Sequence, residues 1–208
     1  MAEPRSSQLV DPRRVRFLLG IPVAMDQLTR CLQDGCREFA QMVGSRWKYK
    51  HDVIDPFGRF RVVAERVGTE LITEASLTDI ARVTGDPETQ VVILFSHWNE
   101  VEIELSGGMV RPEAVVSATA TDYDGWLDVM ACQPVGLAQA MAAQNADRGV
   151  RYAQPFSLGG SDAQLTPLIW FKLMELLLTV LHRAPTRYDQ AFGQAVRLLM
   201  GRNERSYG

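Results

Sequence analysis

The sequence predicts an α/β protein in which a mainly parallel β-sheet lies between two layers of helices, as a three-layer sandwich. Short apolar runs with the character of strands alternate with segments in which apolar residues recur every three or four positions. Glycine, proline and polar turn residues fall between these segments. An alternating order of strands and helices is typical of a parallel sheet that is covered on both faces.

The first third of the chain is predicted to contain two strands and one helix. Residues 15–20, VRFLLG, have the apolar character of a buried strand, and residues 24–45 carry apolar side chains at helical spacing. The polar stretch over residues 46–58, RWKYKHDVIDPFG, contains a proline and a glycine and predicts irregular structure. A second strand, RFRVVAERV, is expected from about residue 59 to residue 66.

One helix and two strands follow in the middle of the chain. Residues 76–82, SLTDIAR, begin with a serine and an aspartate three residues later, which predicts a capping box and a short helix. Residues 91–98, VVILFSHW, predict a core strand. Residues 101–105, VEIEL, alternate apolar and acidic side chains, so we expect a half-buried strand with Glu102 and Glu104 on its solvated face.

The last part of the chain predicts four helices and two strands. The helices are expected over residues 111–119, 134–146, 161–182 and 186–200, and the strands over residues 125–132 and 150–152.

Composition and charge indicate which class of protein and which partners to expect. The chain has 208 residues, of which 46% are apolar and 23% are charged, as in ordinary globular domains. Its 22 basic and 25 acidic residues are nearly balanced, so no overall field draws it to nucleic acid or to an anionic membrane. We predict one domain over residues 1–208, with residues 1–13 as a flexible lead, and neither a nucleic acid nor a membrane partner.

The cysteines predict a reducing compartment. Cys31, Cys36 and Cys132 are odd in number, and the start of the chain lacks the pattern of a signal peptide, so we expect thiols in the cytoplasm. Cys31 and Cys36 lie five residues apart on one predicted helix, and no second cysteine pair completes a zinc site. We therefore predict no metal and no cofactor.

Two candidate catalytic residues end consecutive core strands. His97 follows the run VVILFS, and Cys132 follows WLDVMA. In an open parallel sheet, catalytic groups gather beyond the carboxyl ends of the strands. A neighbouring imidazole favours the thiolate of a cysteine or takes its proton during attack, which is the minimum machinery of a cysteine peptidase. A cysteine at the end of a strand is also a common packing residue.

The order of these elements resembles that of the caspase-like cysteine peptidases, in particular their bacterial CHAT branch. The resemblance lies in VVILFSHW, VEIELSGGMV and LDVMACQP: a strand that ends in a small residue and His, a β-hairpin, a helix, and a strand that ends in a small residue and Cys. It implies that His97 is a general base or ion-pair partner and that Cys132 attacks the scissile carbonyl of a protein or peptide. It also implies control by a separate activating protein, in a bacterial defence or cell-death system.

Four more residues are candidate oxyanion or substrate contacts, namely Ser96, Trp98, Glu100 and Asp128. The family usually has glycine after the histidine, where a backbone N–H helps to form the oxyanion hole; the indole of Trp98 would reshape or cover the cleft. Relatives that cut after basic residues commonly carry an acid two residues before the nucleophile, where this chain has Met130. Asp128 shares the strand face of Cys132 but lies nearer the sheet interior, and Glu100 lies beside Trp98. We expect no strict preference for Arg or Lys.

Two alternatives stay open. A non-catalytic module of the same fold, with Trp98 blocking the cleft, would serve as a binding or scaffold subunit. A hydrolase of small-molecule thioesters or amides would use the same His97 and Cys132 dyad.

Overall fold

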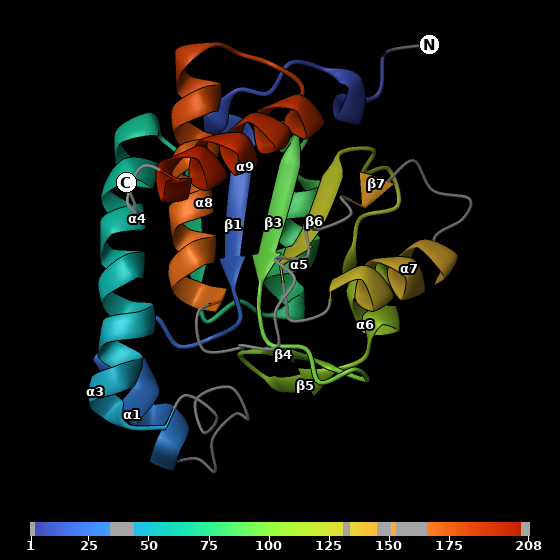
Figure 1. Cartoon of the computed structure of the whole chain (residues 1–208). Helices are drawn as coiled ribbons and strands as arrows, with labels where there is room; N and C mark the ends of the chain where they lie inside the picture. Colours follow the sequence, from blue (N-terminus) through green and yellow to red (C-terminus); the bar gives the residue numbers. More distant parts are fainter. Residues whose placement is uncertain (1–2, 34–43, 131–133, 145–150, 153–165, 205–208) are drawn as a thin grey trace.

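The computed structural model of the chain has a central parallel sheet between layers of helices (Figure 1). It describes residues 3–33, 44–130, 134–144, 151–152 and 166–204. Every neighbouring pair in the sheet is parallel, and its strands in spatial order are β2 (Glu70–Thr73), β1 (Val15–Leu19), β3 (Val91–Phe95), β6 (Trp126–Met130) and β7 (Arg151–Tyr152). The predicted α/β class and parallel sheet are confirmed.

Helices cover both faces of this sheet (Figure 1). One face carries α4 (Asp55–Val67), α8 (Thr166–Arg183) and α9 (Tyr188–Glu204). The other face carries α5 (Leu77–Gly85), α6 (Pro112–Ala118) and α7 (Pro134–Gln144). The three-layer arrangement is therefore the predicted one.

Smaller elements lie around the two ends of the sheet. Toward the carboxyl ends of the strands lie α1 (Met25–Gln33), α3 (Arg46–Tyr49), the π-helical turn η3 (Lys50–Ile54), and an antiparallel hairpin of β4 (Ile103–Leu105) and β5 (Gly108–Val110) (Figure 1). At the opposite end lie the 3₁₀ turns η1 (Arg5–Ser7) and η2 (Pro12–Arg14).

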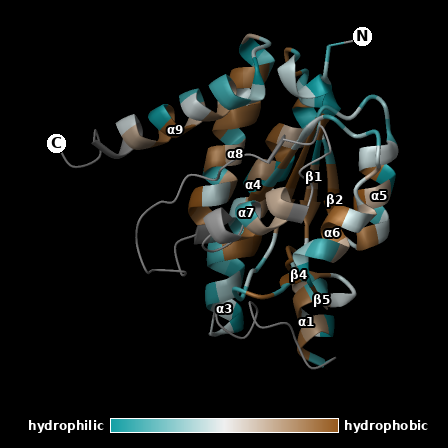
Figure 2. Cartoon of the chain, turned by 90° about the vertical axis from the view of Figure 1, so that its right-hand side faces the viewer, coloured by the Kyte–Doolittle hydropathy of each residue, from teal (hydrophilic) through white to brown (hydrophobic). Residues whose placement is uncertain are grey.

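Two apolar clusters separate the sheet from its helical layers, because successive strand residues point to opposite faces. Phe17 and Ile93 belong to the cluster under α4, α8 and α9, whereas Leu18 and Val92 belong to the cluster under α5, α6 and α7. Figure 2 shows the hydrophobic residues gathered between these layers. Phe171 of α8 anchors the first cluster, with ring centroids 5.2–5.8 Å from those of Phe57, Phe60 and Phe95.

Most of the predicted elements are confirmed within the described residues. The capping box at Ser76 is complete, since its side chain accepts from the Asp79 N–H while the Asp79 carboxylate accepts from the Ser76 N–H. The other confirmed elements are β1, α1, β3, β4, α6, β6, α7, β7, α8 and α9.

The prediction for residues 46–66 was wrong, because this segment is helical almost throughout. The expected strand over residues 59–66 is part of α4, which buries Phe57, Phe60, Ala64 and Val67 on one face. Their spacing is helical, and it outweighs the strand tendency of the two adjacent valines inside the run. The first strand after β1 is instead β2, a short edge strand that was not predicted.

The start of the chain, for which a flexible lead was predicted, makes contacts with the rest of the protein. Residues 3–13 pack against the amino-terminal ends of the strands, and Val10 is fully buried. The Arg5 guanidinium donates to the Asp124 carboxylate and to the carbonyl oxygens of Asp86 and Thr89. These hydrogen bonds attach the segment to the loops at this end of the sheet.

None of the helices in the described part of the chain is both long enough and apolar enough to span a bilayer.

Candidate active site

The site is built on the carboxyl ends of two adjacent strands, β3 and β6. Phe95 and Met130, their last residues, are paired in the parallel register, and the Ser96 N–H donates to the Met130 carbonyl oxygen over 3.1 Å. His97 follows directly and is buried, with 4% of its surface exposed. Cys132 comes two residues after Met130 in the sequence and lies outside the described residues.

A second hairpin, in which residues 97–99 pair with residues 102–104, fixes the backbone of His97 and is the one called the hairpin below. The Glu104 N–H donates to the His97 carbonyl oxygen over 2.9 Å, and the Asn99 N–H donates to the Glu102 carbonyl oxygen over 3.2 Å. The Asn99 side chain closes the turn, since its Oδ1 accepts from the backbone N–H groups of Val101 and Glu102. The hydrogen bonds of this turn therefore fix the backbone from which the imidazole projects.

Gly20, directly after β1, packs against this hairpin at close range. Its N–H donates to the Phe95 carbonyl oxygen over 2.9 Å, and the Ser96 hydroxyl donates to the Glu104 carbonyl oxygen beside it. A Cβ at position 20 would lie 2.3 Å from that carbonyl oxygen and 2.6 Å from Ser96 Oγ. Only glycine allows the end of β1 to approach the segment that carries His97 so closely.

Gly20→Ala should therefore destabilise the protein by about 1–3 kcal/mol, because the added methyl group meets backbone that has little room to shift. The free energy of unfolding in urea measures the effect. Gly58→Ala is the matched control: apart from its chain neighbours and the adjacent backbone of its own helix, no atom lies within 4 Å of its added Cβ. In the interior of α4 this change should stabilise by about 0.5–1 kcal/mol. Equal effects of the two substitutions would contradict the proposed close contact.

Trp98 points into the core. Only 8% of its surface is exposed, and it belongs to the apolar cluster under α5, α6 and α7. It forms an antiparallel bridge with Ile103, in which the neighbouring residues exchange the hydrogen bonds. In a pair of this kind the backbone N–H of Trp98 points away from the partner strand. The indole thus packs inward, while the backbone donor faces away from the hairpin ladder.

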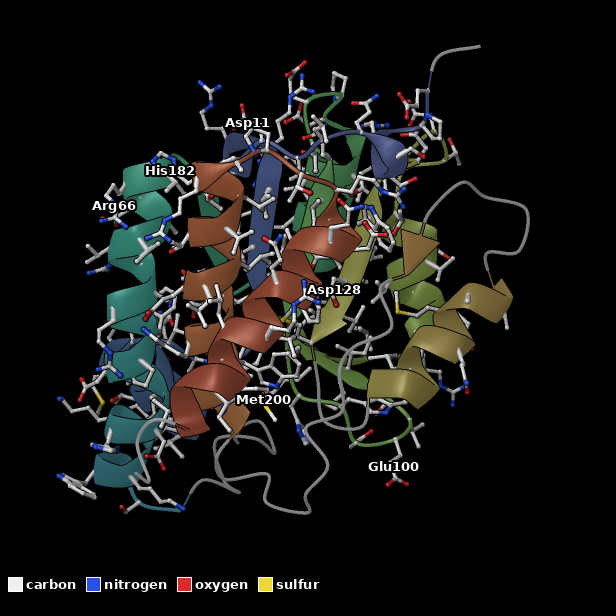
Figure 3. All side chains as sticks on the ribbon, turned by 45° about the horizontal axis from the view of Figure 1, so that its top comes forward. Asp11, Arg66, Glu100, Asp128, His182 and Met200 are labelled. Atoms are coloured by element: carbon white, nitrogen blue, oxygen red, sulfur yellow. The ribbon has the colours of Figure 1, made fainter. Side chains whose placement is uncertain are left out.

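Asp128 lies in the middle of β6, opposite Ile93, and is completely buried. The Tyr188 hydroxyl of α9 donates to its Oδ2. Burial raises the pKa of Asp128 from 3.8 to about 7, and this hydrogen bond partly offsets the rise. Figure 3 shows Asp128 beside α9. In this arrangement its carboxylate packs against the helical layer and presents no exposed face to a substrate.

Glu100 occupies the tip of the hairpin turn. It is exposed and has a positive φ of 76°, which is uncommon for a residue with a side chain. Figure 3 shows Glu100 at the outer end of the hairpin, with its side chain pointing away from the protein. Of the four expected contact residues, Ser96 and Trp98 thus adjoin His97 in the buried edge of the sheet, whereas Glu100 is solvated.

Glu104 adjoins His97, and the sequence pattern predicted its surroundings wrongly. The alternation in VEIEL predicted a solvated side chain, but Glu104 is completely buried beside the backbone of His97. Glu102, the other acid of the pattern, is only partly buried. The difference arises because the hairpin folds back onto the ends of β1 and β3, so that both of its faces are covered at Glu104.

The cysteine prediction needs one correction. Cys31 is disulfide-bonded, so the expectation that all three cysteines are thiols is wrong for this residue, and it no longer argues for a reducing compartment. Cys36, like Cys132, lies outside the described residues. Within the described ranges, no group of three or more His, Cys, Asp or Glu side chains is placed to hold a metal ion.

Comparisons of the chain with protein-family models, with curated proteins and with solved structures gave no match.

Proposed function

We propose that this chain is a caspase-like cysteine endopeptidase in which His97 and Cys132 form the catalytic dyad. One observation carries the proposal: β3 and β6 are adjacent, parallel and level at their carboxyl ends, with Phe95 paired to Met130. His97 and Cys132 each come two residues later in the sequence. Residues at equal distances from paired positions on neighbouring parallel strands share one edge of the sheet.

In the proposed reaction, the His97 imidazole takes the proton of the Cys132 thiol, and the thiolate attacks the carbonyl carbon of a peptide bond. The tetrahedral oxyanion collapses as the imidazolium returns its proton to the leaving amine, which leaves a thioester on the sulfur. Water then attacks the thioester with the imidazole as base, and the acid product and the free thiol are released. This sequence needs no metal and no cofactor.

The backbone of Trp98 supports an oxyanion-stabilising role next to this dyad. Its N–H directly follows His97 and points away from the hairpin ladder, which is how a donor to a developing negative charge must be presented. The buried indole lies in the apolar cluster and so does not favour the alternative of a blocked, non-catalytic module. The glycine that the family usually has at this position is replaced without losing the backbone donor.

The substrate is proposed to be a protein or peptide without a strict requirement for Arg or Lys. Asp128, the acid nearest to Met130 on β6, is buried against Tyr188, so no described acid of this strand is presented to a basic side chain. An activating protein partner and a part in bacterial defence are further predictions, which follow from the resemblance alone. A cytoplasmic location also stays a prediction, which was drawn from the cysteines and from the lack of a signal-peptide pattern.

An irreversible thiol probe tests the proposal. Iodoacetamide at neutral pH should label Cys132 fastest in the wild type, because a neighbouring imidazole increases the thiolate fraction. The reagent is added after the disulfide of Cys31 has been reduced and the reductant removed, and peptide mass spectrometry measures the labelling. His97→Ala should remove this preference, whereas Cys31→Ala and Cys36→Ala should keep it. Slow labelling of Cys132 that does not depend on His97 would refute the dyad.

A further inference from the structure

We propose that Glu104 is the positioning residue of the dyad: its carboxylate lies on the same face of the hairpin as the His97 imidazole and favours the charged state that the ring takes during the reaction. This inference rests on the proposed peptidase function, because it assigns a third member to the same site. It concerns an acid that lies on the hairpin, seven residues after the histidine.

The strand register places the two side chains together. Trp98 and Ile103 form an antiparallel bridge, so the next residues outward, His97 and Glu104, are directly opposite each other. The Glu104 N–H donates to the His97 carbonyl oxygen over 2.9 Å, as this register requires. Directly opposite residues of an antiparallel pair carry their side chains on the same face, with Cβ atoms about 4.5–5.5 Å apart.

The alternation of side chains identifies that face. Trp98, Ile103 and Leu105 all belong to the apolar cluster under α5, α6 and α7. Glu104 lies between two members of this cluster and points to the other side of the hairpin, and His97, which precedes Trp98, does the same. The acid and the base are therefore neighbours on the face of the hairpin that points away from the cluster under α5, α6 and α7.

Both groups are removed from water. Glu104 is fully buried and His97 is 4% exposed, and the buried atoms include both carboxylate oxygens and Nδ1 of the imidazole. A buried carboxylate favours a positively charged neighbour, and a buried imidazolium favours a negatively charged one. The imidazolium that forms when His97 takes the thiol proton would thus be stabilised by Glu104, as an orienting carboxylate stabilises the base in other nucleophile–base–acid arrangements.

Proton titration of His97 by NMR tests the inference without relying on activity. The chain has three histidines, so ¹³C-labelled histidine gives three signals, which His51→Gln and His182→Gln would assign. In Glu104→Gln the midpoint pH of the His97 titration should fall by about one unit, because a neighbouring negative charge is lost. Glu104→Asp, which keeps the charge, should restore at least half of this difference, and Glu102→Gln, the control acid of the same hairpin, should leave the midpoint unchanged.

The same variants measured with iodoacetamide separate this inference from the proposed function. Glu104→Gln should slow the alkylation of Cys132 at pH 7 about tenfold, in line with the titration. The two measurements can also disagree. If the His97 midpoint shifts but Cys132 reacts no faster than an ordinary thiol, the interaction of Glu104 with His97 is supported and the peptidase is refuted. An unchanged midpoint in folded Glu104→Gln would overturn the inference.

If Glu104→Gln does not fold, a second measurement tests the interaction between Glu104 and His97. The midpoint of the Glu104 carboxyl titration, followed with ¹³C-labelled glutamate, should rise by about one unit when His97 is replaced by Gln, because the imidazolium that favours the carboxylate is then absent. The same midpoint in the wild type and in His97→Gln would show that the two groups do not interact.

Discussion

Replacing His97 by alanine should lower the rate of peptide hydrolysis by about 10²- to 10⁴-fold, the range that a positioned general base contributes. Cys132→Ala should abolish hydrolysis, because the attacking atom is lost. The measurement is kcat/KM on a peptide that the wild type cleaves, selected from a library because the sequence preference is not fixed by an acid near Met130.

His182→Ala is the matched control for the loss of an imidazole. His182 is exposed in the last turn of α8, and Figure 3 shows it at the edge of the molecule that lies far from the hairpin tip marked by Glu100. Its replacement should leave kcat/KM unchanged. Hydrolysis that survives in Cys132→Ala, or that falls equally in both histidine variants, would rule out the proposed dyad.

The stability of the protein should fall as the pH rises from about 4 to about 7, because of Asp128. Burial raises the pKa of this carboxyl in the folded protein to about 7, from 3.8. The folded state therefore holds a proton that the unfolded state releases, so the contribution of Asp128 is largest below pH 4 and is lost as the pH approaches 7. Between pH 5 and pH 8 this loss amounts to about 2–3 kcal/mol.

Asp128→Asn isolates this effect. The amide oxygen can still accept from the Tyr188 hydroxyl, but the residue no longer ionises, so the variant should gain about 2–3 kcal/mol relative to the wild type between pH 5 and pH 8. Urea unfolding at both pH values measures the difference. Asp11, whose pKa is lowered mainly by its hydrogen bond with Arg13, is the control: Asp11→Asn should leave the pH slope in this window unchanged. A wild-type slope that persists in Asp128→Asn would contradict the assignment.

The layers of the fold could be predicted because the core strands are continuous apolar runs. β1, β3 and β6 have buried residues at nearly every position, since a parallel sheet is covered on both faces, and such runs stand out in a sequence. Helix α4 could not be placed in the same way. Its adjacent valines favour a strand locally, and its helical period becomes visible only when Phe57 and Val67 are counted together.

The site was predictable only in part. His97 could be proposed as a site residue because it ends a core strand. That strand lies where the sequence placed it, beside the strand that precedes Cys132. Glu104 and Gly20 could not be found, because their roles depend on how the hairpin folds over the sheet edge. An acid in an alternating strand indicates a solvated face unless a second layer covers that face. Glu104 is buried, but no pattern in the neighbouring sequence indicates that such a layer is present.

The central claim is that the sulfur of Cys132 faces the imidazole of His97 across the carboxyl ends of β3 and β6. A crystal structure of the reduced wild-type protein measures the separation of these two groups directly. We predict that Sγ lies within hydrogen-bonding reach of a ring nitrogen, or that one water molecule bridges the two. A sulfur enclosed in the apolar clusters, or on the opposite face of the sheet from the imidazole, would contradict the claim.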